Sequence, residues 1–150
     1  MRSLDLATCA LLAFCIESAA QGRAHPIIEL RLARAHAAPG YAPRQLEDTT
    51  FYVSDGIIVS DPDIEQAGAD WWEGGLVIHV RMTTQAAKRL EDATKNHIQD
   101  RIAMFLDGQL MGAPTIAMGI SGPTLQLDIG PPAPVDRIAA EISARWPTPQ

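Results

Sequence analysis

RIAMFLDGQLMGAP, residues 101 to 114, is the stretch from which we interpret the rest of the chain. Apolar runs flank Asp107-Gly108, and a type I′ turn needs a positive φ at both central residues, which Asp and Gly tolerate. The stretch therefore predicts a β-hairpin that turns at Asp107-Gly108 and runs into Ala113-Pro114. Turn chemistry alone gives these four residues a structural role and no catalytic one.

Regular patterns on both sides of the hairpin predict further strands and helices. Strands are predicted from alternating apolar and polar residues at 27–36, 76–82 and 124–130, with two shorter strands about Asp55-Gly56 within 51–60. Helices are predicted from apolar spacings of three and four at 84–97 and 135–146, and from the Asp61-Pro62 start signal at 61–68. This order predicts an α+β fold, a two-layer sandwich with helices packed on one face of an antiparallel or mixed sheet.

The chain is 150 residues long, enough for one domain with a real core, or one domain with a small appendage. We divide it into a leader at 1–20, a small N-terminal β/α segment at 25–68 and a main α+β domain at 69–147.

The first residues have the pattern of an export signal. LATCALLAFCI at 6–16 is an apolar stretch of signal-peptide length and too short to span a bilayer, and small residues favour cleavage after Ala20. The alternative is a buried N-terminal helix. Cys9 and Cys15 both lie in this leader, so a processed chain has no thiol. A lipid anchor at Cys15 is less favoured because the bulky Phe14 precedes it. We therefore expect a periplasmic or secreted protein.

The overall charge excludes some classes of partner. A formal net charge of −6 argues against a nucleic-acid binder and against a polybasic membrane-surface protein. No segment after the leader is long and apolar enough to cross a membrane.

The sequence shows no pattern that predicts catalysis. The four His residues are scattered, with no pair at the spacing of one metal site, so we expect neither a metal nor a cofactor. Ser121 lies between glycines but lacks the strand-to-helix elbow of a serine nucleophile. We therefore predict no catalytic residue and no enzyme activity.

Two kinds of residue are candidates for binding. Trp71-Trp72 are adjacent, so in a strand they point in different directions and at least one stays partly exposed. The alternative is that both pack over the base of the last helix. Met111 and Met118 line an adaptable peptide-binding surface or fill core gaps, whereas Met104 is expected in the core. We name Trp71, Trp72, Met111 and Met118 as candidate substrate-binding residues.

The opening hairpin belongs to a longer series of segments: Thr94–Asn96, Arg101–Met104, Leu106–Gly108, Ala113-Pro114, Ile116, Ile120–Gly122, Leu125–Gly130 and Val135–Ile142, with Glu29–Leu32 and Val59–Ala67 upstream. Together these segments resemble the large periplasmic head domain of SecD, a subunit of the bacterial preprotein translocase. It covers most of the chain after residue 25 and is most specific at 94–130. Two departures are Pro123, in place of a second glycine, and Asp128, where the family has a small polar residue.

The resemblance implies a stand-alone, non-enzymatic envelope protein that contacts an extended polypeptide. It does not extend to the membrane-spanning segments with the proton-driven machinery, so we expect no coupling to a proton gradient. The implied partners are an exported polypeptide or components of the Sec translocon. We expect an extended chain to be held by β-addition at an exposed sheet edge, or in a groove beside Trp71, Trp72, Met111 and Met118. The alternative is a structural or interaction module of an unrelated envelope assembly.

Overall fold

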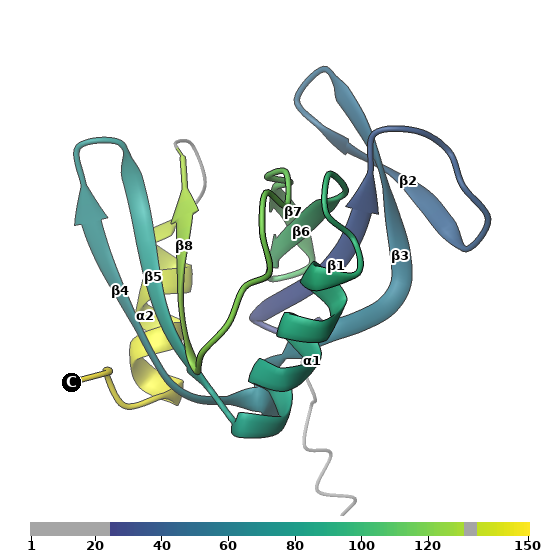
Figure 1. Cartoon of the computed structure of the whole chain (residues 1–150). Helices are drawn as coiled ribbons and strands as arrows, with labels where there is room; N and C mark the ends of the chain where they lie inside the picture. The colour runs from purple at the N-terminus through teal and green to yellow at the C-terminus, as the bar shows by residue number, and fades with distance from the viewer. Residues whose placement is uncertain (1–24, 131–134) are drawn as a thin grey trace, which may run out of the picture.

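A computed structural model describes residues 25–130 and 135–150 (Figure 1). The predictions for the leader at 1–20, including Cys9 and Cys15, lie outside the described residues. The strands and helices are β1 (Ile28–Arg34), β2 (Tyr41–Leu46), β3 (Thr49–Ser60), a short 3-10 helix η1 (Asp61–Asp63), β4 (Ile64–Trp72), β5 (Gly75–Met82), α1 (Thr84–Lys95), β6 (Arg101–Leu106), β7 (Gln109–Gly112), β8 (Thr124–Ile129) and α2 (Val135–Arg145).

The strands divide between two antiparallel sheets. Sheet A has the order β2-β3-β1-β6-β7 and sheet B the order β4-β5-β8. Figure 1 shows α1 beside β3 of sheet A, and α2 beside β4 of sheet B. The prediction of antiparallel sheet with helices is confirmed. Helices on one face of a single sheet are not confirmed, because the strands form two sheets.

One large apolar core joins both sheets and both helices. Leu30 and Met104 of sheet A, Ile78 of sheet B, Leu90 of α1 and Ile142 of α2 all belong to it. Because burial of apolar surface is the main favourable term in folding, this shared core holds the two sheets together as one unit.

Sheet A also has apolar residues on its second face. Ala33, Val53, Ala103, Phe105 and Leu110 form a smaller cluster there. As a result β6 is buried on both sides: Ile102 through Leu106 are all buried, with even-numbered residues in the large core and odd-numbered ones in the small cluster.

The opening hairpin has the predicted form. Asp107 and Gly108 have φ values of 49° and 79°, the positive values that a type I′ turn requires. The Pro114 carbonyl accepts a hydrogen bond of 3.0 Å from the Ile102 N–H, so the Ala113-Pro114 segment lies back against β6.

The helix predicted at 61–68 is wrong. Only Asp61–Asp63 turn, as η1, and the chain then enters β4. The Asp61 carboxylate is not a helix cap; it accepts hydrogen bonds of 2.9 Å from the N–H groups of Ile27 and Ile28. Pairing of β4 with β5 satisfies the backbone that a helix would otherwise have used, so tertiary pairing overrides the local start signal.

Two further differences concern the edge of sheet A. Asp55-Gly56 does not form a turn between two short strands, since both residues lie within the continuous strand β3 where its register to β1 shifts. β2 lies at 41–46, where the sequence patterns predicted no strand. Its Pro43 is tolerated because β2 is an edge strand.

The division of the chain at residue 68 stays a prediction; position 68 falls inside β4. Within the described residues, neither helix has the length and apolar character needed to cross a membrane.

Candidate functional site

Sheet B has one face in the core and one face open. Its register places Leu76 opposite Ile129 and Ile78 opposite Leu127, and these four residues are buried in the large core. Side chains alternate along a strand, so the residues between them lie on the opposite side. We call that side the outer face of sheet B; its side chains include those of Asp70, Trp72, Val77, His79, Arg81, Gln126 and Asp128.

Trp71 and Trp72 end β4 on opposite faces of the sheet. Trp71 is 54% exposed and Trp72 is 71% exposed, so the alternative in which both pack under the last helix is wrong. In the register Trp72 lies opposite Gly75, and Trp71 lies opposite Leu76 on the core side. Trp146, which directly follows α2, is buried. Two large aromatic side chains are therefore exposed to solvent at the tip of sheet B.

A cavity of about 440 Å³ lies beside Trp72; we call it the tip cavity. Its lining residues are Trp72, Gly74, Gly75, Leu76, Val77, Gln126, Asp128, Ile129 and Gly130. Val77 is buried but belongs to neither apolar cluster, which places it as an apolar floor on the outer face. Gln126 Nε2 donates a hydrogen bond of 2.9 Å to Asp128 Oδ1 at its rim.

A second cavity of about 230 Å³ lies between the two sheets; we call it the inter-sheet groove. Its lining is mostly apolar and consists of Leu30, Leu90, Ile102, Met104, Pro114–Met118, Ile120 and Leu125–Leu127. Met118 is 72% exposed, so its side chain stands at the mouth and not in the core. Met104 is buried, as predicted.

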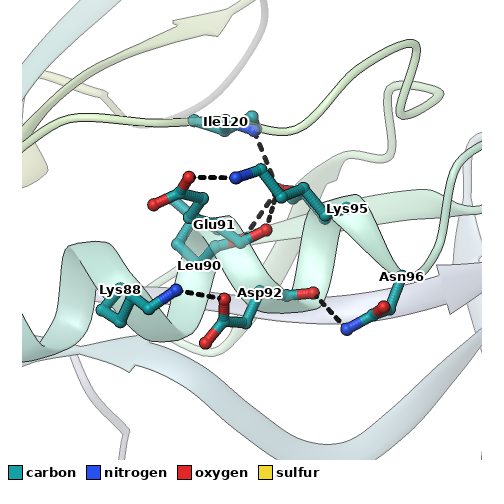
Figure 2. Close-up of polar contacts among 8 residues, drawn as sticks. Lys88, Leu90, Glu91, Asp92, Lys95, Asn96 and Ile120 are labelled. Atoms are coloured by element: carbon teal, nitrogen blue, oxygen red, sulfur yellow. Dashed lines mark hydrogen bonds and ion pairs between the residues drawn. The ribbon is translucent and has the colours of Figure 1, made fainter.

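Thr94 fixes the segment that forms one wall of this groove. Its Oγ1 accepts a hydrogen bond of 2.8 Å from the Ile120 N–H and donates one of 2.7 Å to the Leu90 carbonyl. Figure 2 shows Ile120 beside the end of α1. Thr94 is fully buried, so this hydroxyl ties the β7–β8 connection to the helix at a point without competing water.

The outer surface of α1 carries two ion pairs, both drawn in Figure 2. A hydrogen bond to Asp92 raises the pKa of Lys88, and one from Lys95 lowers the pKa of Glu91. These side chains neutralise one another in solvent. The charges of these four side chains are therefore paired with one another.

The four predicted binding residues do not share one site. Trp72 lines the tip cavity, Met118 lines the inter-sheet groove, and Met111 is half-buried and lines a third cavity of about 320 Å³. Trp71 lies on the core side of the tip.

β8 is the element that connects the first two cavities. Gln126 lines both the tip cavity and the inter-sheet groove, which open on opposite faces of this strand. In the described part of the chain, β8 is paired on one side only, with β5, so its other edge presents unpaired backbone groups. The site is thus a free strand edge with a cavity on each face.

The sequence did not identify Gln126, Asp128 or Val77 as candidate binding residues. A signal was present, because the alternation in 124–130 assigns Leu125, Leu127 and Ile129 to the core and so the residues between them to the open side. What the sequence lacked was the position of β8 at a sheet edge.

The remaining outer-face residues are polar. His79 Nε2 lies 3.4 Å from Asp70 Oδ2, next to a cavity of about 520 Å³ that the last residues of the chain also line.

Over residues 25–130 and 135–150, no three His, Cys, Asp or Glu side chains gather as a metal site.

Comparison with known proteins identifies relatives of this fold. A crystal structure of SecDF in a super-membrane-facing form aligns with a TM-score of 0.55 and 18% identity over 81% of this chain and 19% of that one. A structure of SecDF, described as a membrane component that enhances protein export, aligns with a TM-score of 0.53 and 20% identity over 78% of this chain and 60% of that one. At these identities the likeness shows the fold alone.

This chain thus spans only part of the length of either SecDF structure. No curated protein matches it. A family model described as the SecDF P1 head subdomain matches residues 38–129, which is more than half of the chain and includes β2 through β8. The chain therefore belongs to the SecDF P1 head subdomain family.

Proposed function

We propose that this protein takes part in protein export by binding an extended polypeptide along the free edge of β8. The role is that of a binding module in the cell envelope, without catalysis. Its partners on this proposal are exported polypeptides, with the Sec translocon as the site of action.

Family membership supports the general role. One of the two similar structures is described as a component that enhances protein export. The head subdomain is the part of such proteins that this chain matches, so an export-related task is the function that the family favours.

The observation that carries the proposal is the pair of cavities on the two faces of one edge strand. An added strand forms backbone hydrogen bonds with an exposed edge, and its side chains alternate between the two faces. At β8 one set of side chains would enter the tip cavity and the other the inter-sheet groove, since Gln126 borders both.

The size of the inter-sheet groove fits one side chain at a time. An apolar cavity of roughly 150 Å³ holds a benzene ring, and this groove has about 230 Å³. It therefore suits a single large aliphatic or aromatic side chain. Met118 at the mouth can adjust to different shapes, because an unbranched thioether chain is flexible.

Binding of a synthetic strand tests the proposal. A nine-residue peptide that alternates Val and Thr is titrated into the ¹⁵N-labelled protein, and amide shifts are followed by NMR. We expect the largest shifts at residues 124–129 of β8, with a change in the fluorescence of Trp72, which is 71% exposed.

Backbone methylation gives a matched control within the same peptide. In one peptide the odd-numbered residues are N-methylated, and in the other the even-numbered residues. One of the two peptides then lacks the N–H groups that point to β8, and the other lacks those that point away from it. β-Addition is supported if just one of the two methylated peptides loses binding. Equal binding of both methylated peptides, or no binding of the parent peptide, contradicts it and favours an interaction module of another envelope assembly.

A further inference from the structure

We propose that the tip cavity selects a cationic side chain, lysine or arginine, so that the bound polypeptide alternates cationic and apolar residues. This inference rests on the proposed function and names the class of polypeptide that the β8 edge takes.

The tip cavity combines an aromatic wall with an apolar floor. The Trp72 ring is exposed over this part of the sheet, and Val77 lies buried beneath. The methylene stem of lysine or arginine packs on such a surface while its charged head stays in water. The face of an indole ring also attracts a cation electrostatically.

Carboxylates supply the opposite charge at the rim. Asp128 is exposed and lines the cavity, and Gln126 holds its Oδ1. Within the described residues Oδ2 of Asp128 has no hydrogen-bond partner, so it is available to an incoming ammonium or guanidinium group. Asp70 on the same face and Glu73 in the adjoining turn are also exposed.

Basic residues on this face lie away from the tip. Arg81 belongs to the outer face, but the register places it opposite Thr124 and Gln66, at the end of β5 remote from Gly75. His79 lies between, beside Asp70. Among the described residues, the tip cavity is lined by one carboxylate, that of Asp128, and by no basic side chain.

The opposite face of β8 has a different chemistry. The inter-sheet groove is lined mainly by apolar residues such as Met104, Leu125 and Leu127. Adjacent residues of an added strand point to opposite faces. The two cavities together therefore favour a cationic side chain at one position of the bound strand and an apolar side chain at the next. Such a segment is positively charged and amphipathic, and its charge is opposite to the net charge of −6 of this protein.

Three peptides that differ only in their polar residue test this selectivity. The Val–Thr peptide serves as the neutral reference, and Thr is replaced by Lys in the second peptide and by Glu in the third. We expect the Lys peptide to bind about three- to tenfold more tightly than the reference, as a cation–π contact and an exposed ion pair allow. The Glu peptide should bind more weakly than the reference. Added salt should reduce the difference in affinity between the Lys and Glu peptides.

Two variants assign the effect to the tip cavity. Asp128→Asn and Trp72→Leu should each reduce the ratio of Lys-peptide to Thr-peptide affinity, because each removes one of the groups that attract the cation. Asp92→Asn removes the same charge from the exposed side of α1, where Asp92 pairs with Lys88 and does not line the tip cavity, and should leave the ratio unchanged.

The outcomes separate this inference from the proposed function. Equal affinity for the three peptides overturns the cationic selectivity and leaves β-addition standing. A ratio that falls as much in Asp92→Asn as in Asp128→Asn also overturns it, because net charge and not the tip cavity then explains the preference. Absence of binding by every peptide overturns the proposed function itself.

Discussion

Sheets A and B differ in how many of their faces are buried. Sheet A has apolar clusters on both sides, and its strand β6 is buried from Ile102 through Leu106. Sheet B contributes one face to the shared core and leaves the other open, with Trp72 and Asp128 exposed on it.

The difference separates a scaffold from a binding surface. A strand packed on both sides has no room for a partner, and its residues are constrained by volume. A sheet with one open face and a free edge can accept another chain and still retain its core. Substitutions in sheet A should therefore change stability, and those on the outer face of sheet B should change binding.

The largest expected effect is a difference in stability between variants at Leu106 and at Trp72. Leu106 is 1% exposed in β6, so Leu106→Ala leaves a cavity and should lower the free energy of unfolding by about 2–5 kcal/mol. Trp72→Ala should change it by less than about 0.5 kcal/mol, because the side chain is already in solvent. Urea denaturation measures both. Similar losses in the two variants would contradict the division between scaffold and surface.

Gly75 tests whether the tip of sheet B has its own structural requirement. Its φ is +137°, and an added Cβ would lie 2.2 Å from the Ile129 carbonyl oxygen. Gly75→Ala should cost about 1–3 kcal/mol and disturb the amide signals of the tip cavity. Gly74→Ala is the matched control, since no atom lies within 4 Å of its added Cβ. If the two alanine variants are equally stable, the close packing of β5 on β8 at this point is not required.

Thr94 tests the connection that joins the two sheets. Thr94→Val keeps the shape but removes the hydroxyl that accepts from the Ile120 N–H, and should cost about 1–2 kcal/mol. The Ile120 amide should also exchange faster with solvent, and the inter-sheet groove should lose affinity for an apolar side chain. Thr94→Ser retains the hydroxyl and should keep slow exchange. Fast exchange in the serine variant would instead assign the effect to packing of the methyl group.

The smallest effect is expected on the solvent side of α1. The hydrogen bond from Lys95 lowers the pKa of Glu91 in the folded protein. A lowered folded-state pKa stabilises the protein above the unfolded-state pKa, and this stabilisation is lost as pH falls through the folded value. Glu91→Gln should thus be slightly less stable than the parent protein near neutral pH and equal to it in acid. A difference that persists in acid would show that the charge is not its source.

Two Asp-Gly pairs show how far local sequence predicts this fold. At Asp107-Gly108 the chain turns as predicted, with both φ values positive. At Asp55-Gly56 the same dipeptide lies inside β3, where the register to β1 shifts. Flanking strands β6 and β7 pair with each other in the first case, whereas in the second β3 pairs with β1 and β2 on either side. The partner strands, which are distant in sequence, decide between turn and bulge.

The candidate site was predictable only in part. The adjacent tryptophans indicated exposure, and both are more than half exposed. Their assignment to one groove with Met111 and Met118 required knowledge of the strand order. The structure places Trp72, Met118 and Met111 at three different cavities. Asp128 stood out in the sequence as a departure from the SecD pattern, yet its place beside Trp72 follows from pairing of β8 with β5.

The sequence by itself determined the hairpin at 101–112, the inward faces of β5 and β8, the two helices and the likeness to the SecD head. These depend on periodicity and turn chemistry within short segments, which residues near in sequence settle. Only the tertiary structure decided that 64–72 is a strand, that the strands form two sheets, and that β8 is an edge with a cavity on each face. Those features depend on which distant segments pair, because a backbone donor or acceptor is satisfied by whichever strand the whole core brings beside it.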